Sequence, residues 1–480
     1  MDNPTLVRTR IAPSPTGELH IGGLRTLLYD YALARKYKGQ FILRIEDTDQ
    51  KRFIPGSQER IMQVIKDYNL SWDEGPDIGG SYGPYIQTER LDIYKKYIQI
   101  LLNKGLAYYC FCTQERLNNL REEQRSQKKL PKYDQHCLHL SKEEIQKNLD
   151  SKVSYTIRMV IPKNETVVFE DLIRGKIKFN TNDIDDQVLI KSNGIPTYHF
   201  AVVVDDQLMN ITHVLRAEEW LSSTPKHVLL YKYFGWDMPK TAHLTVLLDP
   251  DHKGKMSKRH GSVHARIFLE NGYLPEAVLN FLMLLGWNPG TEQEIFTLSD
   301  FVKQFSIEKL NKKAPAFDRK KLDYINGVYI RQKTDSELVE LLKPFIPEVS
   351  FEILMQIIPL IKERITTLKD AANLTKFLFE DVSYDKTLLL QKNITPELAH
   401  DMLNKTKELI LNLKTFDFLT LQTNLLDQIK SNNWNTGQFF MVFRVAICGS
   451  VSTPPVVDCL PIIGKEATLR KINLAIDLLN

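Results

Sequence analysis

The amino-terminal stretch at residues 8–49 constrains the fold more than any other part of the chain. A short apolar run at Ile11 and Ala12 gives way to Pro, Ser, Pro, Thr and Gly, and an amphipathic segment then continues to Gly39. A second apolar run at residues 41–45 leads into acidic residues. Strand, helix and strand of these lengths form a βαβ unit, which gathers ligands at the carboxyl ends of its strands. The Pro-Ser-Pro-Thr-Gly loop and the acidic residues each follow one of these strand ends.

The predicted helix begins near His20, because apolar side chains at residues 24–32 recur at helical spacing. We expect Gly39 to provide its left-handed cap. Gly22 and Gly23 in the first turn let a ligand approach bare N–H groups, and the helix dipole favours negative charge there. The place therefore suits a triphosphate, to which the His20 imidazole can donate a hydrogen bond. Taken alone, His-x-Gly-Gly also describes an ordinary helix start.

A lysine-rich loop lies far downstream of this unit. Residues 253–261 read Lys-Gly-Lys-Met-Ser-Lys-Arg-His-Gly and contain Lys255 and Lys258. By itself such a run is also typical of an ordinary solvated loop. Together the two stretches resemble the paired signatures of class I aminoacyl-tRNA synthetases, His-Ile-Gly-His and Lys-Met-Ser-Lys-Ser. The strings Ser-Pro-Thr-Gly at residues 14–17 and Arg-Ile-Glu-Asp-Thr-Asp at residues 44–49 are similar to bacterial-type glutamyl-tRNA synthetases in particular.

Two positions depart from these signatures. Gly23 stands where the first signature ends in histidine, and Arg259 stands where the second ends in serine. Small residues at the first position are familiar in glutamyl enzymes. We therefore expect His20 to serve the phosphates without a second imidazole.

The resemblance implies a multidomain fold of the α/β plus all-α class, in which a Rossmann-type parallel-sheet catalytic domain is split by an α+β insertion. The valines at residues 202–204 are typical of a parallel strand buried on both faces, and the sheet is expected to resume at residues 188–191. The expected domains are the first half of the catalytic domain at residues 1–108, a tRNA acceptor-binding insertion at 109–186, the second half of the catalytic domain at 187–262, a helical stem-contact domain at 263–335 and a helical anticodon-binding domain at 336–480.

Two short pairs, Cys-x-Cys and Cys-x-His, supply a set of metal ligands: Cys110, Cys112, Cys137 and His139. Three thiolates and one imidazole suit tetrahedral Zn²⁺, which takes four protein ligands when its role is structural. Some synthetases of this family carry such a set at the matching place, whereas others have lost it. The alternative is scattered buried cysteines beside a surface histidine. The other two cysteines, Cys448 and Cys459, are expected to be buried apolar thiols.

The resemblance implies a reaction in two steps. L-glutamate attacks the α-phosphate of ATP, giving glutamyl-adenylate and diphosphate, and glutamate then passes to the 3′-terminal adenosine of tRNA(Glu), releasing AMP. Because an anion meets a polyanion in the first step, positioning and well-placed cations must supply the catalysis. By resemblance this role falls on His20, Lys255 and Lys258, with Mg²⁺ on the leaving diphosphate. ATP binding falls on Pro13, Ser14, His20, Gly22, Gly23 and Lys258.

By resemblance, glutamate binding falls on Arg10, Ser14, Glu46, Tyr198, Arg216 and Trp220. Arginine offers a planar fork that matches a carboxylate, and Arg10 and Arg216 lie at predicted strand ends. A neutral amide facing these arginines would leave a charge unpaired, so glutamine should be rejected strongly. Tyr198 and Trp220 are also compatible with plain core aromatics, and Glu46 with a capping or ion-pairing carboxylate.

Several other assignments stay open. The enzyme could be non-discriminating and also charge tRNA(Gln), since the sequence gives no base-contact code and offers only Arg444 as a candidate anticodon contact. Glutaminyl-tRNA synthetase is disfavoured, because that sister typically has Glu-Pro-Asn-Gly in place of the string at residues 14–17. A catalytically idle tRNA-binding paralogue is opposed by intact His20 and Lys258. Small adenylyltransferases, and a truncated paralogue that modifies a tRNA base, would not need the carboxyl-terminal helices.

Composition sets broader limits. The net charge of +4 over 480 residues requires any nucleic-acid-binding surface to be local. No segment approaches the roughly 18 apolar residues of a membrane helix, and the amino terminus does not resemble a signal peptide. An odd number of cysteines argues against a disulfide framework. We therefore expect a cytoplasmic protein without a membrane segment, and a monomer because no exposed coiled-coil pattern is present.

Overall fold

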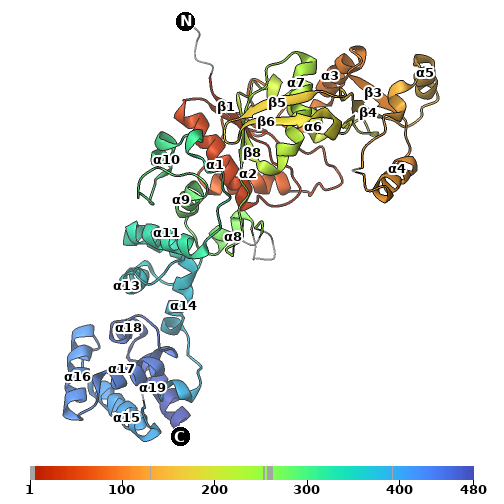
Figure 1. Cartoon of the computed structure of the whole chain (residues 1–480). Helices are drawn as coiled ribbons and strands as arrows, with labels where there is room; N and C mark the ends of the chain where they lie inside the picture. Colours follow the sequence, from red (N-terminus) through yellow and green to blue (C-terminus); the bar gives the residue numbers. More distant parts are fainter. Residues whose placement is uncertain (1–5, 130, 252–253, 257–262, 392) are drawn as a thin grey trace. The chain divides into compact units, whose positions relative to one another are not determined.

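The computed structural model describes residues 6–129, 131–251, 254–256, 263–391 and 393–480 (Figure 1). The chain divides into two compact units, one comprising Met1–Ile267 with Val278–Arg319 and the other comprising Phe268–Ala277 with Lys320–Asn480. The five-part division expected from the sequence is finer than this and stays a prediction. No helix in the described ranges combines the length and the hydropathy needed to cross a lipid bilayer.

The first unit begins with the expected βαβ arrangement. Strand β1 (Arg8–Ile11) pairs in parallel with β2 (Gln40–Leu43), and helix α1 (Ile21–Lys36) connects them. The expected left-handed cap at Gly39 is wrong by one residue, since Lys38 has φ 52°. Gly39 is required for another reason, because a Cβ there would lie 1.9 Å from the carbonyl oxygen of Val7.

A second parallel pair extends this nucleotide-binding core. Strand β8 (His213–Ala217) pairs in parallel with β9 (Lys240–Leu244), and α7 (Thr224–Phe234) connects them. The N–H group of Thr212, just before β8, donates to the carbonyl oxygen of Arg8 in β1 at 2.9 Å. The carboxyl ends of β1, β2 and β8 therefore meet at one edge, as a Rossmann-type domain requires.

The segment between the two pairs forms an α+β region. Strands β3 (Ala107–Cys110), β4 (Thr156–Met159) and β7 (Val188–Ile190) form one sheet in the order β3-β4-β7. Strands β5 (Thr166–Asp171) and β6 (Gly175–Asn180) form an antiparallel hairpin that joins β9 through the pair Asp171 and Thr241. The remaining helices of this segment and of the first half are α2 (Ser57–Asp67), α3 (Leu91–Asn103), α4 (Gln114–Ser126) and α5 (Lys142–Asp150).

Two strand predictions are wrong. Residues 202–204 lie in helix α6 (Tyr198–Leu208), whose valines are buried within a core shared with α3 and α7. A short apolar run buried on every side carries no periodicity, so a strand and a buried helix have the same pattern. Strand β7, where the parallel sheet was expected to resume, pairs with β4 in the three-stranded sheet instead.

Past residue 262 the described chain is mainly helical, as expected. The helices are α8 (Ala265–Glu270), α9 (Pro275–Leu284), α10 (Leu298–Gln304), α11 (Arg319–Gln332), α12 (Asp335–Leu342), α13 (Phe351–Ile361), α14 (Leu368–Phe379), α15 (Pro396–Asn412), α16 (Phe418–Ser431), α17 (Thr436–Cys448), α18 (Val456–Ile463) and α19 (Lys465–Leu479). Phe439, Val442 and Ile472 are among the fully buried side chains that join α17 to α19 in the second unit. Cys448 and Cys459 are buried in the same core, and burial raises the pKa of each thiol to about 12.

Candidate active site and metal centre

A cavity of about 630 Å³ opens at the carboxyl ends of β1, β2 and β8. Its walls come from the loop after β1, the segment after β2, the start of α6 and the turn after β8. Nine of the residues predicted for ATP or glutamate binding line it: Arg10, Pro13, Ser14, His20, Gly23, Glu46, Tyr198, Arg216 and Trp220. The predicted site residues therefore line one cavity, although they range from Arg10 to Trp220 in the chain.

His20 forms the amino-terminal cap of α1. Its backbone is extended, with φ −73° and ψ 146°, and its Nδ1 accepts a hydrogen bond from the N–H group of Gly22 at 3.0 Å. Because Nδ1 is the acceptor, a neutral His20 carries its proton on Nε2. The ring is thus fixed as a hydrogen-bond donor at the positive end of the helix dipole, where phosphate oxygens are favoured.

Arg10 lies in a buried ion-pair network at the floor of the cavity. Its Nε lies 3.1 Å from Asp206, whose same oxygen is 2.8 Å from Arg44. Arg44 also contacts Glu46 at 3.0 Å. Burial, only partly offset by Arg44, raises the pKa of Glu46 to about 7. An ammonium group placed against Glu46 would restore the carboxylate, because a nearby cation favours the charged form.

The sequence analysis did not single out Asp206 and Arg44 as residues that hold the site together. Asp205 completes their network, since it lies 2.8 Å from Arg90 and 3.7 Å from Arg44. The available sequence signal was the acidic pair that directly follows the valine run. Reading that run as a strand placed the pair at a strand end, whereas α6 turns both carboxylates into the core.

Arg216 meets a different set of partners. Its hydrogen bonds go to imidazole nitrogens and hydroxyl oxygens of His243, Thr224, His227 and Tyr198, at 2.8 to 3.4 Å. Within the part of the chain that the structure describes, it forms no ion pair with a carboxylate. The guanidinium is therefore a buried cation whose charge is available to an anionic ligand.

Two aromatic side chains form the wall beside Arg216. The rings of Tyr198 and Trp220 lie 4.3 Å apart between centroids, and Trp220 is 37% exposed. The Tyr198 hydroxyl lies 3.4 Å from Nη1 of Arg216. This combination of an apolar wall and one polar tip suits the methylene groups and the end of a short acidic side chain.

Lys191 is a second residue that sequence reasoning missed. It lines the cavity at the end of β7, and its Nζ donates to the carbonyl oxygen of Thr48 at 2.8 Å. Burial lowers its pKa, and the nearby Asp49 opposes that shift. Nothing in the sequence distinguished this lysine from the other lysines that follow strands.

Of the two lysines predicted to bind phosphate, the structure describes only Lys255. Lys255 is ion-paired with Glu219 and is not among the residues that line the cavity. Lys258 and Arg259 fall outside the described residues. Gly22 lies in the first turn of α1, where it donates to His20, and does not itself line the cavity.

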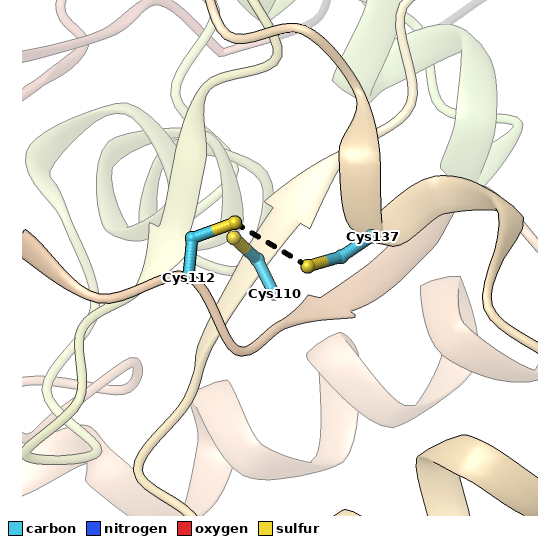
Figure 2. A group of neighbouring side chains, drawn as sticks. All are labelled: Cys110, Cys112 and Cys137. Carbon is cyan, nitrogen blue, oxygen red and sulfur yellow. Dashed lines mark hydrogen bonds between the residues drawn. The ribbon is translucent and has the colours of Figure 1, made fainter. Parts of the chain in front are cut away.

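Three of the four predicted metal ligands meet in the α+β region. The sulfur atoms of Cys110, Cys112 and Cys137 all lie within 4.8 Å of one another, and Figure 2 shows them turned toward a common point. His139 is exposed and does not belong to this group. The hydroxyl of Tyr133, which the sequence did not single out, lies 3.3 Å from the sulfur atoms of both Cys110 and Cys112.

Two arginines lie beside the cysteine group and Tyr133. Nη1 of Arg116 lies 3.4 Å from the sulfur of Cys112, and Arg158 lies over the Tyr133 ring at 4.0 Å. A hydrogen bond from Cys137 lowers the pKa of Cys110, and the same contact raises the pKa of Cys137. Thiolates are the form that binds metal, and neighbouring cations favour them.

The whole chain matches known proteins. Residues 6–324 match the family model described as tRNA synthetases class I (E and Q), catalytic domain, and residues 337–476 match the anticodon binding domain model. The chain is 43% identical to a glutamate–tRNA ligase of Borreliella afzelii, with 98% of each chain covered. It is 42% identical to a glutamate–tRNA ligase of Clostridioides difficile, with 97% of this chain and 98% of that one covered.

A solved structure agrees with these sequence matches. The crystal structure of a glutamate tRNA ligase from Elizabethkingia meningosepticum, in complex with its amino acid, gives a TM-score of 0.88 at 38% identity, covering 99% of this chain and 100% of that chain. The chain therefore belongs to the class I tRNA synthetases of the E and Q family.

Proposed function

We propose that the chain is a glutamate–tRNA ligase that activates L-glutamate with ATP and transfers it to the 3′-terminal adenosine of tRNA(Glu). The observation that carries the proposal is Arg216, a buried cation without a carboxylate partner among the described residues, in the cavity that also holds the cap of α1. The whole-length similarity to curated glutamate–tRNA ligases supports the same activity.

In the activation step, this chain must hold ATP against the amino acid. The Nε2–H of His20 and the amino terminus of α1 offer donors to phosphate oxygens, which lowers the cost of bringing an anion to a polyanion. Pro13, Ser14 and Gly23 shape the adjoining wall. Lys255 and Lys258 would neutralise the leaving diphosphate together with Mg²⁺, which phosphate oxygens themselves bind well.

In the same step, the amino acid is oriented by opposite charges. Arg216 receives the side-chain carboxylate, which the wall of Tyr198 and Trp220 directs toward it. Arg10 and Ser14 face the other end of the substrate, and Glu46 accepts the ammonium group. Glutamine would present a neutral amide to Arg216, so its binding would leave the buried cation without a counter-charge.

We propose that the cysteine group holds a structural Zn²⁺. Three sulfur atoms that converge within 4.8 Å, with arginines nearby to balance the negative charge of three thiolates, fit a tetrahedral site. The bound metal would tie the end of β3 to the segment that carries Cys137. The fourth ligand is open between His139, which the sequence favoured, and Tyr133, whose hydroxyl already lies beside two of the sulfur atoms.

Metal content tests the zinc proposal. Purified protein is expected to contain a single Zn²⁺ per chain by mass spectrometry, and Cys137→Ser is expected to lose it, because the remaining ligands no longer complete the tetrahedron. Cys448→Ser, which alters a buried thiol of the second unit, should keep the metal. Parallel His139→Ala and Tyr133→Phe variants identify the fourth ligand. Full zinc retention in Cys137→Ser would contradict the site.

We propose tRNA(Glu) as the substrate of a monomeric, cytoplasmic enzyme, with charging of both tRNA(Glu) and tRNA(Gln) as the alternative. The helices of the second unit would bind the anticodon, with Arg444 on α17 as one contact. The tRNA proposals rest on the family and its anticodon binding domain, and the monomer rests on the absence of an exposed coiled-coil pattern in the sequence.

The deciding experiment is ATP-dependent attachment of labelled glutamate to two purified tRNAs, tRNA(Glu) and tRNA(Gln), with labelled glutamine as the control amino acid. We expect glutamate on tRNA(Glu) and no attachment of glutamine. Glutamate on tRNA(Gln) as well would define a non-discriminating enzyme. If neither tRNA accepts glutamate while both still bind, the protein is a tRNA-binding paralogue without activity, and the proposed function is wrong.

A further inference from the structure

We infer that Asp171 and His243 are positioning residues for Arg216, holding its guanidinium toward the cavity without cancelling its charge, and that they thereby set the selectivity for a carboxylate side chain. The inference rests on the proposed function, because it concerns how the proposed glutamate pocket discriminates. It assigns a role to Asp171, which lies on the β5–β6 hairpin, far in sequence from every strand end that forms the pocket.

The two buried arginines that line the cavity are held in different ways. Arg10 shares the carboxylate of Asp206 with Arg44, so its positive charge is largely compensated inside the protein. Arg216 is held equally firmly, but Nε donates to Nε2 of His243 at 3.0 Å and Nη2 donates to the hydroxyl of Thr224 at 2.8 Å. Neutral acceptors fix the orientation of a cation and leave its charge for the ligand.

His243 can act as this acceptor only if its proton lies on Nδ1. Nδ1 lies 2.6 Å from Oδ2 of Asp171, and both side chains are fully buried. Burial opposes ionisation of Asp171, yet hydrogen bonds from His243 and from the N–H groups of Ile173 and Arg174 lower its pKa. The ionised carboxylate requires a proton on Nδ1, which turns the lone pair of Nε2 toward Arg216.

The Nη1 atom of the Arg216 guanidinium also faces an imidazole nitrogen. Nη1 of Arg216 lies 3.2 Å from Nδ1 of His227, and Nε2 of His227 lies 3.1 Å from Nδ1 of His199. Burial and Arg216 lower the pKa of His227; burial also lowers the pKa of His243, although the hydrogen bond to Asp171 opposes that shift. Because a guanidinium offers only N–H donors, the imidazole nitrogen that faces it on each histidine must be an unprotonated acceptor. Thr224 donates its own proton to the carbonyl oxygen of Trp220 at 3.1 Å, which leaves its oxygen free to accept from Arg216.

Asp171 therefore acts on the pocket through one imidazole. The residue pairs with Thr241 at the single point where the hairpin joins β9, and its carboxylate also accepts the N–H group of His243 at 3.1 Å. These contacts fix the carboxylate with respect to β9, and β9 lies beside β8, which carries Arg216. The position of the guanidinium is thus set jointly by three strands.

Substitutions of His243 separate positioning from simple packing. Glutamine can place an amide oxygen near the position of Nε2, whereas methionine has a similar length and no comparable acceptor. With saturating tRNA(Glu), we expect His243→Met to raise the KM for glutamate about 10- to 100-fold, the loss typical of a hydrogen bond to a charged group. The KM for ATP should change less than about twofold, and His243→Gln should recover most of the glutamate affinity.

Asp171→Asn tests the proton position without changing side-chain size. The backbone N–H groups of Ile173 and Arg174 retain the amide oxygen, so the NH₂ group faces Nδ1 and drives the proton to Nε2, against the N–H of Arg216. We expect the same selective rise in the KM for glutamate, and a lower ratio of glutamate to glutamine charging. In a His243→Met background, Asp171→Asn should add little, since both changes act through one contact.

His213→Met changes a half-buried histidine at the opposite end of β8, outside the cavity, and should leave the KM for glutamate unchanged. Equal glutamate KM values for wild type and Asp171→Asn, or a parallel rise in the KM for ATP, would overturn the positioning role. Failure of the wild-type protein to charge glutamate would instead overturn the proposed function, so the two failures are distinguishable.

Discussion

Arg216→Met is expected to lower kcat/KM for glutamate by about 1,000-fold, the largest effect of any substitution in the cavity, since removing one partner of a buried charged pair costs several kcal/mol. Methionine keeps much of the side-chain length and removes the charge, so the substrate carboxylate would be desolvated without a counter-ion. Steady-state charging of tRNA(Glu) with glutamate measures the loss directly.

Arg216→Lys provides the matched control for this prediction. Lysine retains the charge but not the planar fork, so a single ammonium nitrogen must replace the Nε and Nη2 atoms that donate to His243 and Thr224. We expect an intermediate loss, mainly in the KM for glutamate. An Arg216→Met enzyme that retained wild-type kcat/KM would show that the glutamate side chain binds elsewhere.

His20→Asn is expected to lower the rate of adenylate formation about 100-fold, the usual cost of removing one donor that stabilises developing charge. Asparagine is a strong helix cap, so it can still accept the N–H group of Gly22 and preserve the start of α1. What it lacks is the Nε2–H that we propose as the donor to the phosphates. Rapid-quench measurement of adenylate formation with tRNA(Glu) present isolates this step.

His20→Ala separates the two roles of the imidazole. We expect the same kinetic loss together with about 1 kcal/mol lower stability, because the cap is lost as well. Urea unfolding of His20→Asn and His20→Ala measures the stability difference. Equal adenylate rates for wild type and His20→Asn would mean that the backbone N–H groups of α1 alone hold the phosphates.

The βαβ unit could be predicted because its residues act locally. The loop after Ile11, the glycines at the start of α1 and the apolar spacing that follows each favour one local structure. The valine run of α6 was misread because burial on all sides removes the amphipathic pattern. Strand β7 was assigned to the wrong sheet, since pairing partners depend on contacts that are distant in sequence.

The predicted cavity residues fall in one place because they follow strand ends, a rule of topology rather than of side-chain chemistry. Their partners could not be predicted in this way. Asp171 and His243 lie on strands whose register is known only from the structure, and both look like ordinary strand residues in the sequence. The hydroxyl of Tyr133 likewise lies beside the cysteine sulfur atoms only because of how the chain folds. The spacing of Cys and His residues in the sequence gives no sign of this contact.

The burial of the cysteines has a practical consequence for labelling. All five lie within the described residues, and Cys112 alone is half-exposed while the other four are buried. A thiol-reactive fluorophore should therefore attach first at Cys112, and a metal bound to that sulfur would block it. Uptake of the dye, followed over time in the presence of a chelator, would turn this single side chain into an optical reporter of metal loss in the intact enzyme.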